Sequence, residues 1–131
     1  MVISFKKATR TKAKLRMALI VGGKSGKTYT ALSIAQKLGS KIMVLDTEHG
    51  SANKYAGDLF DFDVPEPPMP NYAPRTYVEY IKAVAAAGYE VLIIDSLSHA
   101  LNSKGGVLEM VDNAAKKSNS GSTFNAWRDV T

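Results

Sequence analysis

The stretch "LRMALIVGGKSGKTYTA", residues 15–31, decides the fold. It opens with an apolar run and continues into a glycine-rich loop that ends in Gly26, Lys27 and Thr28. A strand, such a loop and a helix in this order are typical of the phosphate-binding pattern G-x-x-x-x-G-K-[ST]. That pattern asks for glycine five residues before Gly26, where the chain has Val21. Either the loop opens one residue later, at Gly22, or the valine ends the preceding strand in place of the glycine.

The loop residues suit a nucleoside triphosphate. Backbone N–H groups of a glycine-rich turn point at phosphate oxygens, and the positive end of the following helix dipole favours the anion. A lysine at position 27 reaches the β- and γ-phosphates, and a hydroxyl at position 28 holds Mg²⁺. The predicted nucleotide-binding residues are Gly22, Gly23, Lys24, Ser25, Gly26, Lys27, Thr28 and Tyr29. A plain glycine-rich turn before a helix is the alternative.

Short apolar runs and amphipathic stretches alternate along the chain. The apolar runs predict buried strands over residues 16–21, 41–46 and 90–95. Strands that are apolar on both faces indicate a parallel sheet covered by helices, which is an α/β fold. Right-handed crossovers place the carboxyl ends of such strands at one edge, where ligands bind.

Three helices are predicted from apolar spacing and from start and stop signals. The first covers residues 27–38, with Ala31, Ile34, Ala35 and Leu38 on one face. A capping box at residues 76–79 opens the second, which ends at Gly88, and the third follows Gly106. Five prolines within residues 65–74 predict an extended connection before the second helix.

Carboxylates follow the second and third predicted strands. Asp95 ends the strand over 90–95, and beside a phosphate loop it is a predicted Mg²⁺ partner. Glu48 lies just beyond the strand over 41–46, where it could activate the water that attacks the γ-phosphate. Asp46 is more typical of a turn. The two histidines, His49 and His99, have no metal-ligand spacing, so we interpret both as hydrogen-bonding loop residues, His99 near the site.

Composition narrows the class of protein. The 131 residues suffice for one domain, and 45% hydrophobic with 22% charged residues is ordinary for a globular protein. No apolar run approaches the roughly 18 residues that span a bilayer, so no membrane association is expected. The chain has no cysteine, which excludes disulfides and favours a cytoplasmic location.

Positive charge is concentrated at the N-terminus. The net charge is +5, and no acidic residue precedes Asp46. The basic residues of this part are Lys6, Lys7, Arg10, Lys12, Lys14 and Arg16. We therefore divide the chain into a basic arm, residues 1–14, and a nucleotide-binding domain, residues 15–131. The arm could contact DNA or a neighbouring subunit, or it could be a solvated leader.

These segments together resemble the RecA-like branch of the P-loop ATPases, and in particular the AAA-type nucleotide-binding proteins of phages and prophages. The matching segments are "GGKSGKTYTAL", "VLDTEHGSANKYA", "AAGYEVLIIDSLSHAL", "GGVLEMVD" and "FNAWRDVT", and the likeness covers residues 17–131. The resemblance implies a three-layer P-loop NTPase fold, ATP and Mg²⁺ as cofactors, and Lys27, Thr28 and Asp95 as their ligands. It also implies that Glu48 is the catalytic carboxylate.

The same resemblance implies a role in DNA recombination or annealing and a homo-oligomer that hydrolyses ATP between subunits. RecA-like proteins continue with a helix and a central strand after the segment that here ends at Thr131, so an incomplete domain is expected after the Walker B region. In that case the strands over 16–21 and 90–95 would either close up side by side or leave a gap that another chain fills, for instance with a swapped element. Alternatives are a catalytically silent nucleotide-binding, DNA-binding or oligomerisation module and, less favoured, a small-molecule kinase.

Overall fold

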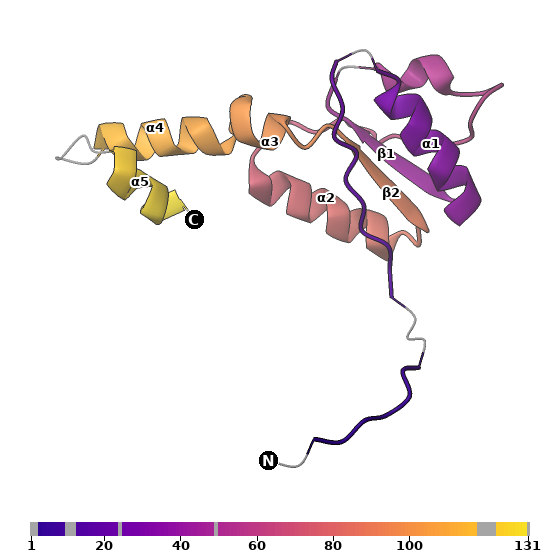
Figure 1. Cartoon of the computed structure of the whole chain (residues 1–131). Helices are drawn as coiled ribbons and strands as arrows, with labels where there is room; N and C mark the ends of the chain where they lie inside the picture. The colour runs from indigo at the N-terminus through magenta and orange to yellow at the C-terminus, as the bar shows by residue number, and fades with distance from the viewer. Residues whose placement is uncertain (1–2, 10–12, 24, 49, 118–122, 131) are drawn as a thin grey trace.

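A computed structural model describes residues 3–9, 13–23, 25–48, 50–117 and 123–130. An α/β unit contains the only strands of this described part, and a helical extension follows it (Figure 1). In chain order the elements are α1 (Lys27–Leu38), β1 (Ile42–Asp46), the 3₁₀ helix η1 (Ala52–Tyr55), α2 (Pro74–Ala86), β2 (Val91–Asp95), α3 (His99–Asn102), α4 (Val107–Lys117) and α5 (Thr123–Val130).

β1 and β2 form a parallel sheet. Their register runs from Ile42 opposite Val91 to Asp46 opposite Asp95, so both strands end in a carboxylate at the same edge. The strands predicted over 41–46 and 90–95 are therefore confirmed to within one residue. The other edge of β1 is partly covered, because the Val44 N–H donates to Asp63 O at 2.9 Å and the Asp63 N–H donates to Ile42 O at 2.9 Å.

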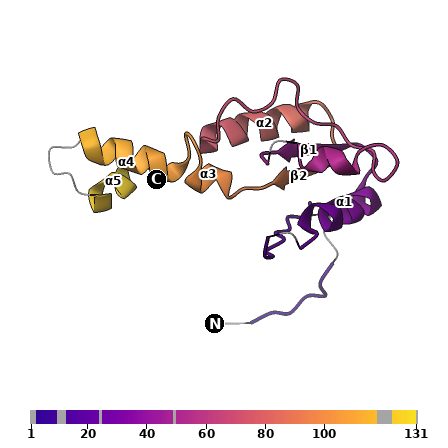
Figure 2. The ribbon, with the colours of Figure 1, turned by 90° about the horizontal axis from the view of Figure 1, so that it is seen from above.

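Helices cover both faces of this sheet: α1 lies on one face and α2 on the other (Figures 1 and 2). On the α1 side, Leu32 and Ala35 pack with Ile42 and Val44. The opposite side chains of β1, Met43 and Leu45, pack with Val84 of α2. Alternate residues of β1 thus point to opposite faces, as expected for a strand buried on both sides.

The strand predicted over residues 16–21 is wrong. This segment is extended but forms no strand, and Ile20 is 92% exposed. A groove of about 910 Å³ separates residues 13–15 and 17–21 from β2. Apolar composition indicates a tendency to be buried, but a strand also needs a partner for its backbone groups. The segment over 16–21 therefore does not close up against β2, which pairs with β1 alone in the described residues.

The groove also explains which side of α1 is buried. The predicted apolar face, Ala31, Ile34, Ala35 and Leu38, lines the groove, and only Ala35 of these four is buried. The residue that packs most deeply is Leu32, which is fully buried against the sheet. The bounds predicted for α1 are confirmed. The predicted burial of this face is confirmed only for Ala35, because no described strand covers the other three residues.

The predicted capping box is also wrong. α2 begins at Pro74, with proline in the first turn, so Thr76 already lies inside the helix. Asn71 organises this start instead: its Oδ1 accepts the Ala73 N–H at 3.0 Å and the Thr76 hydroxyl at 2.6 Å. Proline suits the first helical position because its missing N–H would have no helical partner there.

The helices α3, α4 and α5 extend away from the sheet (Figure 1). α4 and α5 pack on each other through Val111, Ala115 and Ala126, which form a small core of their own. The helix predicted after Gly106 is thus confirmed. The described residues form an α/β fold with two parallel strands, and the larger three-layer RecA-like sheet is a prediction that they do not confirm.

Candidate functional site

The glycine-rich loop leads directly into α1. Gly26, at the N-cap, has φ of 80°, a left-handed conformation that glycine adopts without strain. The Ser25 hydroxyl donates to Gly22 O at 2.5 Å and closes the turn. A Cβ added at Gly22, Gly23 or Gly26 would meet nothing within 4 Å, so the space around the loop is open. Lys24 lies outside the described residues.

Asp95 is the centre of the site. Its side chain is 2% exposed, and the Thr28 hydroxyl donates to its Oδ2. Lys27 Nζ lies 2.9 Å from its Oδ1, and apart from this ion pair Oδ1 has no hydrogen-bond partner in the described part of the chain. The structure therefore brings Lys27, Thr28 and Asp95 together, as their positions at the loop and at a strand end predicted.

Glu48 completes the cluster from the end of β1. Its Oε1 lies 3.6 Å from Lys27 Nζ, and its side chain is 43% exposed. Asp46 does not take part in this cluster. Its Oδ1 accepts the Glu48 N–H at 2.8 Å and its Oδ2 accepts the Ala52 N–H at 2.9 Å, which makes Asp46 the organiser of the turn after β1.

The charges of the cluster do not balance. One lysine faces two carboxylates, which leaves a formal charge of −1 on Lys27, Glu48 and Asp95 together. The hydrogen bond to Asp95 raises the pKa of Lys27 above its ordinary value of 10.5, partial burial opposes this rise, and the charges of Asp95 and Glu48 add to it. Lys27 is therefore cationic, and a further cation would neutralise the remaining negative charge of the cluster.

The structure adds two residues that the sequence did not single out together. Thr47, 2% exposed, lies between β1 and Glu48, and its Oγ1 is 2.6 Å from His99 Nδ1. His99 was predicted to form a hydrogen bond near the site, and the structure identifies Thr47 as a partner. The sequence indicates this contact only by position, because Thr47 follows β1 directly and His99 follows β2 by four residues. His49 lies outside the described residues.

Tyr29 contacts aromatic residues of the segment after β1. Its ring packs edge-on against Tyr55, with centroids 6.1 Å apart, and against Phe60 at 5.4 Å. These contacts give the Tyr29 side chain a packing role between α1 and the segment after β1. A nucleotide contact by Tyr29 stays a prediction.

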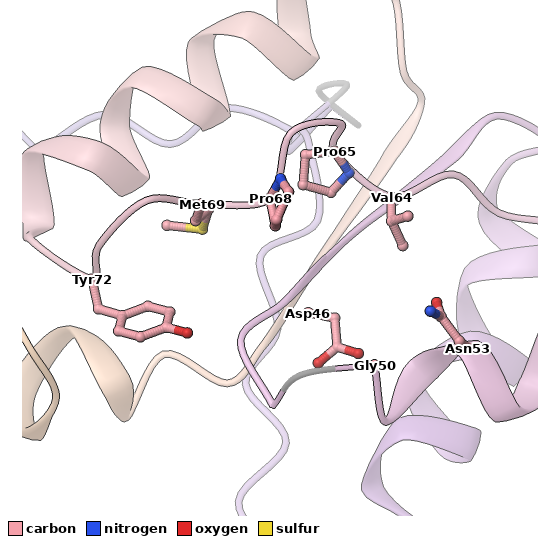
Figure 3. Close-up of a pocket in the computed structure, with 8 residues that line it drawn as sticks. All are labelled: Asp46, Gly50, Asn53, Val64, Pro65, Pro68, Met69 and Tyr72. Carbon is pink, nitrogen blue, oxygen red and sulfur yellow. The ribbon is translucent and has the colours of Figure 1, made fainter.

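A second hollow lies beside the turn after β1 (Figure 3). It has a volume of about 370 Å³, and Asp46, Asn53 and Tyr72 supply its polar groups. Pro65, Pro68 and other residues of the proline-rich connection form its apolar wall. Lys27, Thr28 and Asp95 do not line it but line the larger groove beside β2, which therefore opens onto the candidate site.

Comparison with known proteins agrees with this geometry. A family model described as an AAA domain matches residues 13–131. The chain belongs to the AAA domain family. Membership implies a P-loop NTPase fold that binds ATP. The matched residues include the loop, both strands and the helical extension of this AAA domain. No curated protein and no solved structure matches the chain.

A membrane-spanning element is not among the described elements of this AAA domain. None of the helices in the described ranges has the length and apolar character needed to cross a bilayer.

Proposed function

We propose that the chain is the ATP-binding, Mg²⁺-dependent ATPase core of a RecA-like protein. The observation that carries the proposal is the position of the buried Asp95 carboxylate, which contacts both Lys27 and Thr28 of the phosphate loop. In a P-loop NTPase these are the lysine that binds phosphate, the hydroxyl that binds the metal and the strand-end aspartate.

The residues fit a magnesium ion. Mg²⁺ prefers oxygen ligands and is usually held by one or two protein groups, with water and phosphate oxygens completing its shell. Asp95 Oδ1 is buried without a hydrogen-bond donor apart from the Lys27 ion pair, and the Thr28 hydroxyl lies at the other carboxylate oxygen. No three acidic, histidine or cysteine side chains of the described residues are placed to hold a metal ion by themselves, so phosphate oxygens and water would have to complete the shell. When bound, Mg²⁺ would neutralise charge on the β- and γ-phosphates.

The charge of the cluster supports the same requirement. A nucleoside triphosphate is an anion, and Lys27, Glu48 and Asp95 together already carry −1. Binding the triphosphate without a divalent cation would place like charges next to each other, so we propose that nucleotide and metal bind together. Lys27 would then turn from the carboxylates to the phosphates.

Glu48 is the proposed catalytic residue. Its carboxylate is more exposed than that of Asp95, and it reaches Lys27 from the neighbouring strand. Such a carboxylate can orient a water molecule and accept its proton as the water attacks the γ-phosphate. Asp46 is bound to backbone N–H groups of its own turn, so Glu48 is the group left for this step.

A role in phage DNA recombination or annealing, within the cytoplasm and as a homo-oligomer, follows from the RecA-like resemblance. The arm over residues 1–14 supports DNA contact by its charge, and its described residues, 3–9 and 13–14, are exposed. Exposed lysine and arginine residues bind the phosphate backbone of nucleic acids without reading sequence.

Calorimetric titration with a non-hydrolysable ATP analogue and Mg²⁺ tests the proposal. We expect micromolar binding, lost in Lys27→Ala and kept in Lys37→Ala, the matched control because Lys37 is an exposed lysine in the last turn of the same helix. Glu48→Gln should bind the analogue but lose ATP hydrolysis. Folded protein that binds no analogue would contradict the proposal, and binding without hydrolysis by the unaltered chain would favour the silent module.

A further inference from the structure

Thr47 connects the ends of the two strands. Its N–H donates to Asp95 O at 2.8 Å, and its hydroxyl oxygen accepts the Ser96 N–H at 2.8 Å. The same oxygen lies 3.0 Å from Ser96 O and 2.6 Å from His99 Nδ1. Thr47 is 2% exposed, whereas Ser96 and His99 are half-buried, so the threonine side of these contacts is shielded from water.

Counting protons assigns the direction of each hydrogen bond. A threonine hydroxyl donates once and accepts twice, and three groups lie within 3.0 Å of it here. If it donates to Ser96 O and accepts from Ser96 N–H, its remaining acceptor site needs a donor, which must be His99 Nδ1–H. If it donated to Nδ1 instead, Ser96 O would keep only the longer bond from the Tyr77 hydroxyl, at 3.4 Å, and its 3.0 Å contact with Thr47 would lack a proton. The first arrangement gives a proton to each of the three close contacts, so we assign a proton to His99 Nδ1.

The ring of His99 is held on a second side. It lies against the ring of Tyr72, with centroids 5.3 Å apart and the planes at 34°, and His99 is the first residue of α3. The Tyr72 hydroxyl also points back to Thr47 O, at 3.5 Å. The histidine is therefore fixed both by stacking and by its bond to the threonine.

These contacts restrain the residue that follows Thr47. The peptide that joins Thr47 to Glu48 is held twice: Thr47 is bound to Asp95, Ser96 and His99, and the Glu48 N–H donates to Asp46 Oδ1 at 2.8 Å. We propose that His99 and Thr47 are positioning residues that hold Glu48 at its place opposite Lys27. The inference rests on the proposed function, in which Glu48 activates water, and it assigns no contact of His99 with the nucleotide.

Paired substitutions separate positioning from folding. His99→Ala removes the donor, His99→Asn keeps an N–H near the place of Nδ1, and His99→Gln puts its amide near the place of Nε2. Thr47→Val removes the hydroxyl at constant shape, and Thr47→Ser restores it. Because a misplacement of about 1 Å can cost about 100-fold in rate, we expect kcat to fall by about 10- to 100-fold in His99→Ala, His99→Gln and Thr47→Val.

The other constants should behave differently. The KM for ATP and the Kd of the ATP analogue should stay within about threefold, since neither residue is assigned to the phosphates. His99→Asn and Thr47→Ser should recover most of kcat. An unchanged kcat in His99→Ala, or a Kd that weakens in parallel with kcat, would overturn the inference. If Thr47→Val fails to fold, the three histidine variants still test the positioning role, because His99 is only half-buried and its substitution should leave the fold intact.

Amide hydrogen exchange supplies a readout that needs no turnover. Peptides covering residues 46–50 should exchange faster in His99→Ala than in the unaltered chain or in His99→Asn. Equal exchange rates in all three would overturn the positioning role, even if the unaltered chain bound ATP without hydrolysing it. Binding of ATP without hydrolysis by the unaltered chain would contradict the ATPase activity of the proposed function. The exchange comparison would then decide the role of His99.

Discussion

The ion pair between Lys27 and Asp95 should stabilise the fold before any nucleotide binds. The two charged atoms are 2.9 Å apart, and the side chains are 31% and 2% exposed. Hydrogen bonds to charged groups contribute about 1.5–3 kcal/mol, whereas fully exposed pairs contribute about 0.2–1 kcal/mol. Because solvent reaches the lysine but hardly the aspartate, we expect a coupling of about 1.5 kcal/mol, the lower end of the first range.

A double-mutant cycle measures this coupling. The free energy of unfolding is obtained from urea titrations at pH 7 without nucleotide for the unaltered chain, Lys27→Met, Asp95→Asn and the double variant. Lys27→Met with Glu48→Gln is the matched comparison, since Glu48 is 3.6 Å from the same ammonium and 43% exposed. Its coupling should not exceed about 0.5 kcal/mol.

The pH dependence gives an independent check. Folding raises the pKa of Lys27 above 10.5, so the ammonium form is favoured in the folded state. The associated stability is fully present below pH 10.5 and is lost as the pH rises through the higher folded pKa. The difference in unfolding free energy between the unaltered chain and Lys27→Met should therefore shrink above pH 10.5. A Lys27–Asp95 coupling below about 0.5 kcal/mol, or one that does not change with pH, would refute this reasoning.

Two further predictions concern other parts of the chain. Hydrogen bonds from the Ser40 and Lys41 N–H groups and from the Ser40 hydroxyl lower the pKa of Glu90 below 4.5. Glu90→Gln should therefore reduce the urea midpoint of unfolding at pH 7, and the difference should disappear as the pH falls through the lowered pKa. Equal midpoints at pH 7 would contradict this prediction. Deleting residues 1–14 should weaken binding to single-stranded DNA and reduce the salt slope by about 0.7 for each phosphate that the arm neutralises; affinity and slope that stay the same would remove the arm from DNA binding.

Local patterns predicted the elements whose partners are close in sequence or fixed by burial. Spacing predicted the bounds of α1, and uninterrupted apolar runs predicted β1 and β2, since these signals act through nearby residues. The segment over 16–21 carries the same apolar signal but lacks a strand at its side, which no local pattern can report. For the same reason the buried face of α1 is centred on Leu32 and not on the predicted residues.

Part of the site was predictable because parallel strands end at one edge. That rule placed Asp95 and the residues after β1 at one edge, and the register of β1 and β2 confirms this. The contacts of Asp95 with Lys27 and Thr28 come from the start of α1, which no strand precedes in the described residues. The contact between Thr47 and His99 depends on the register of β1 and β2, which the sequence does not state. Neither residue type is distinctive enough in a loop to reveal the pairing without that register.

The register also determines which carboxylate is free to act. Asp46 and Asp95 lie directly opposite each other at the ends of β1 and β2, and two unshielded carboxylates there would repel. The two carboxylates have different partners: Asp46 accepts hydrogen bonds from backbone N–H groups of its own turn, and Asp95 contacts Lys27 and Thr28. The turn that Asp46 stabilises carries Glu48 to the cluster, where it is the acidic side chain most open to solvent. A slip of one residue between the strands would undo this division, because Thr47 would be separated from Asp95 O and from Ser96 at the same time.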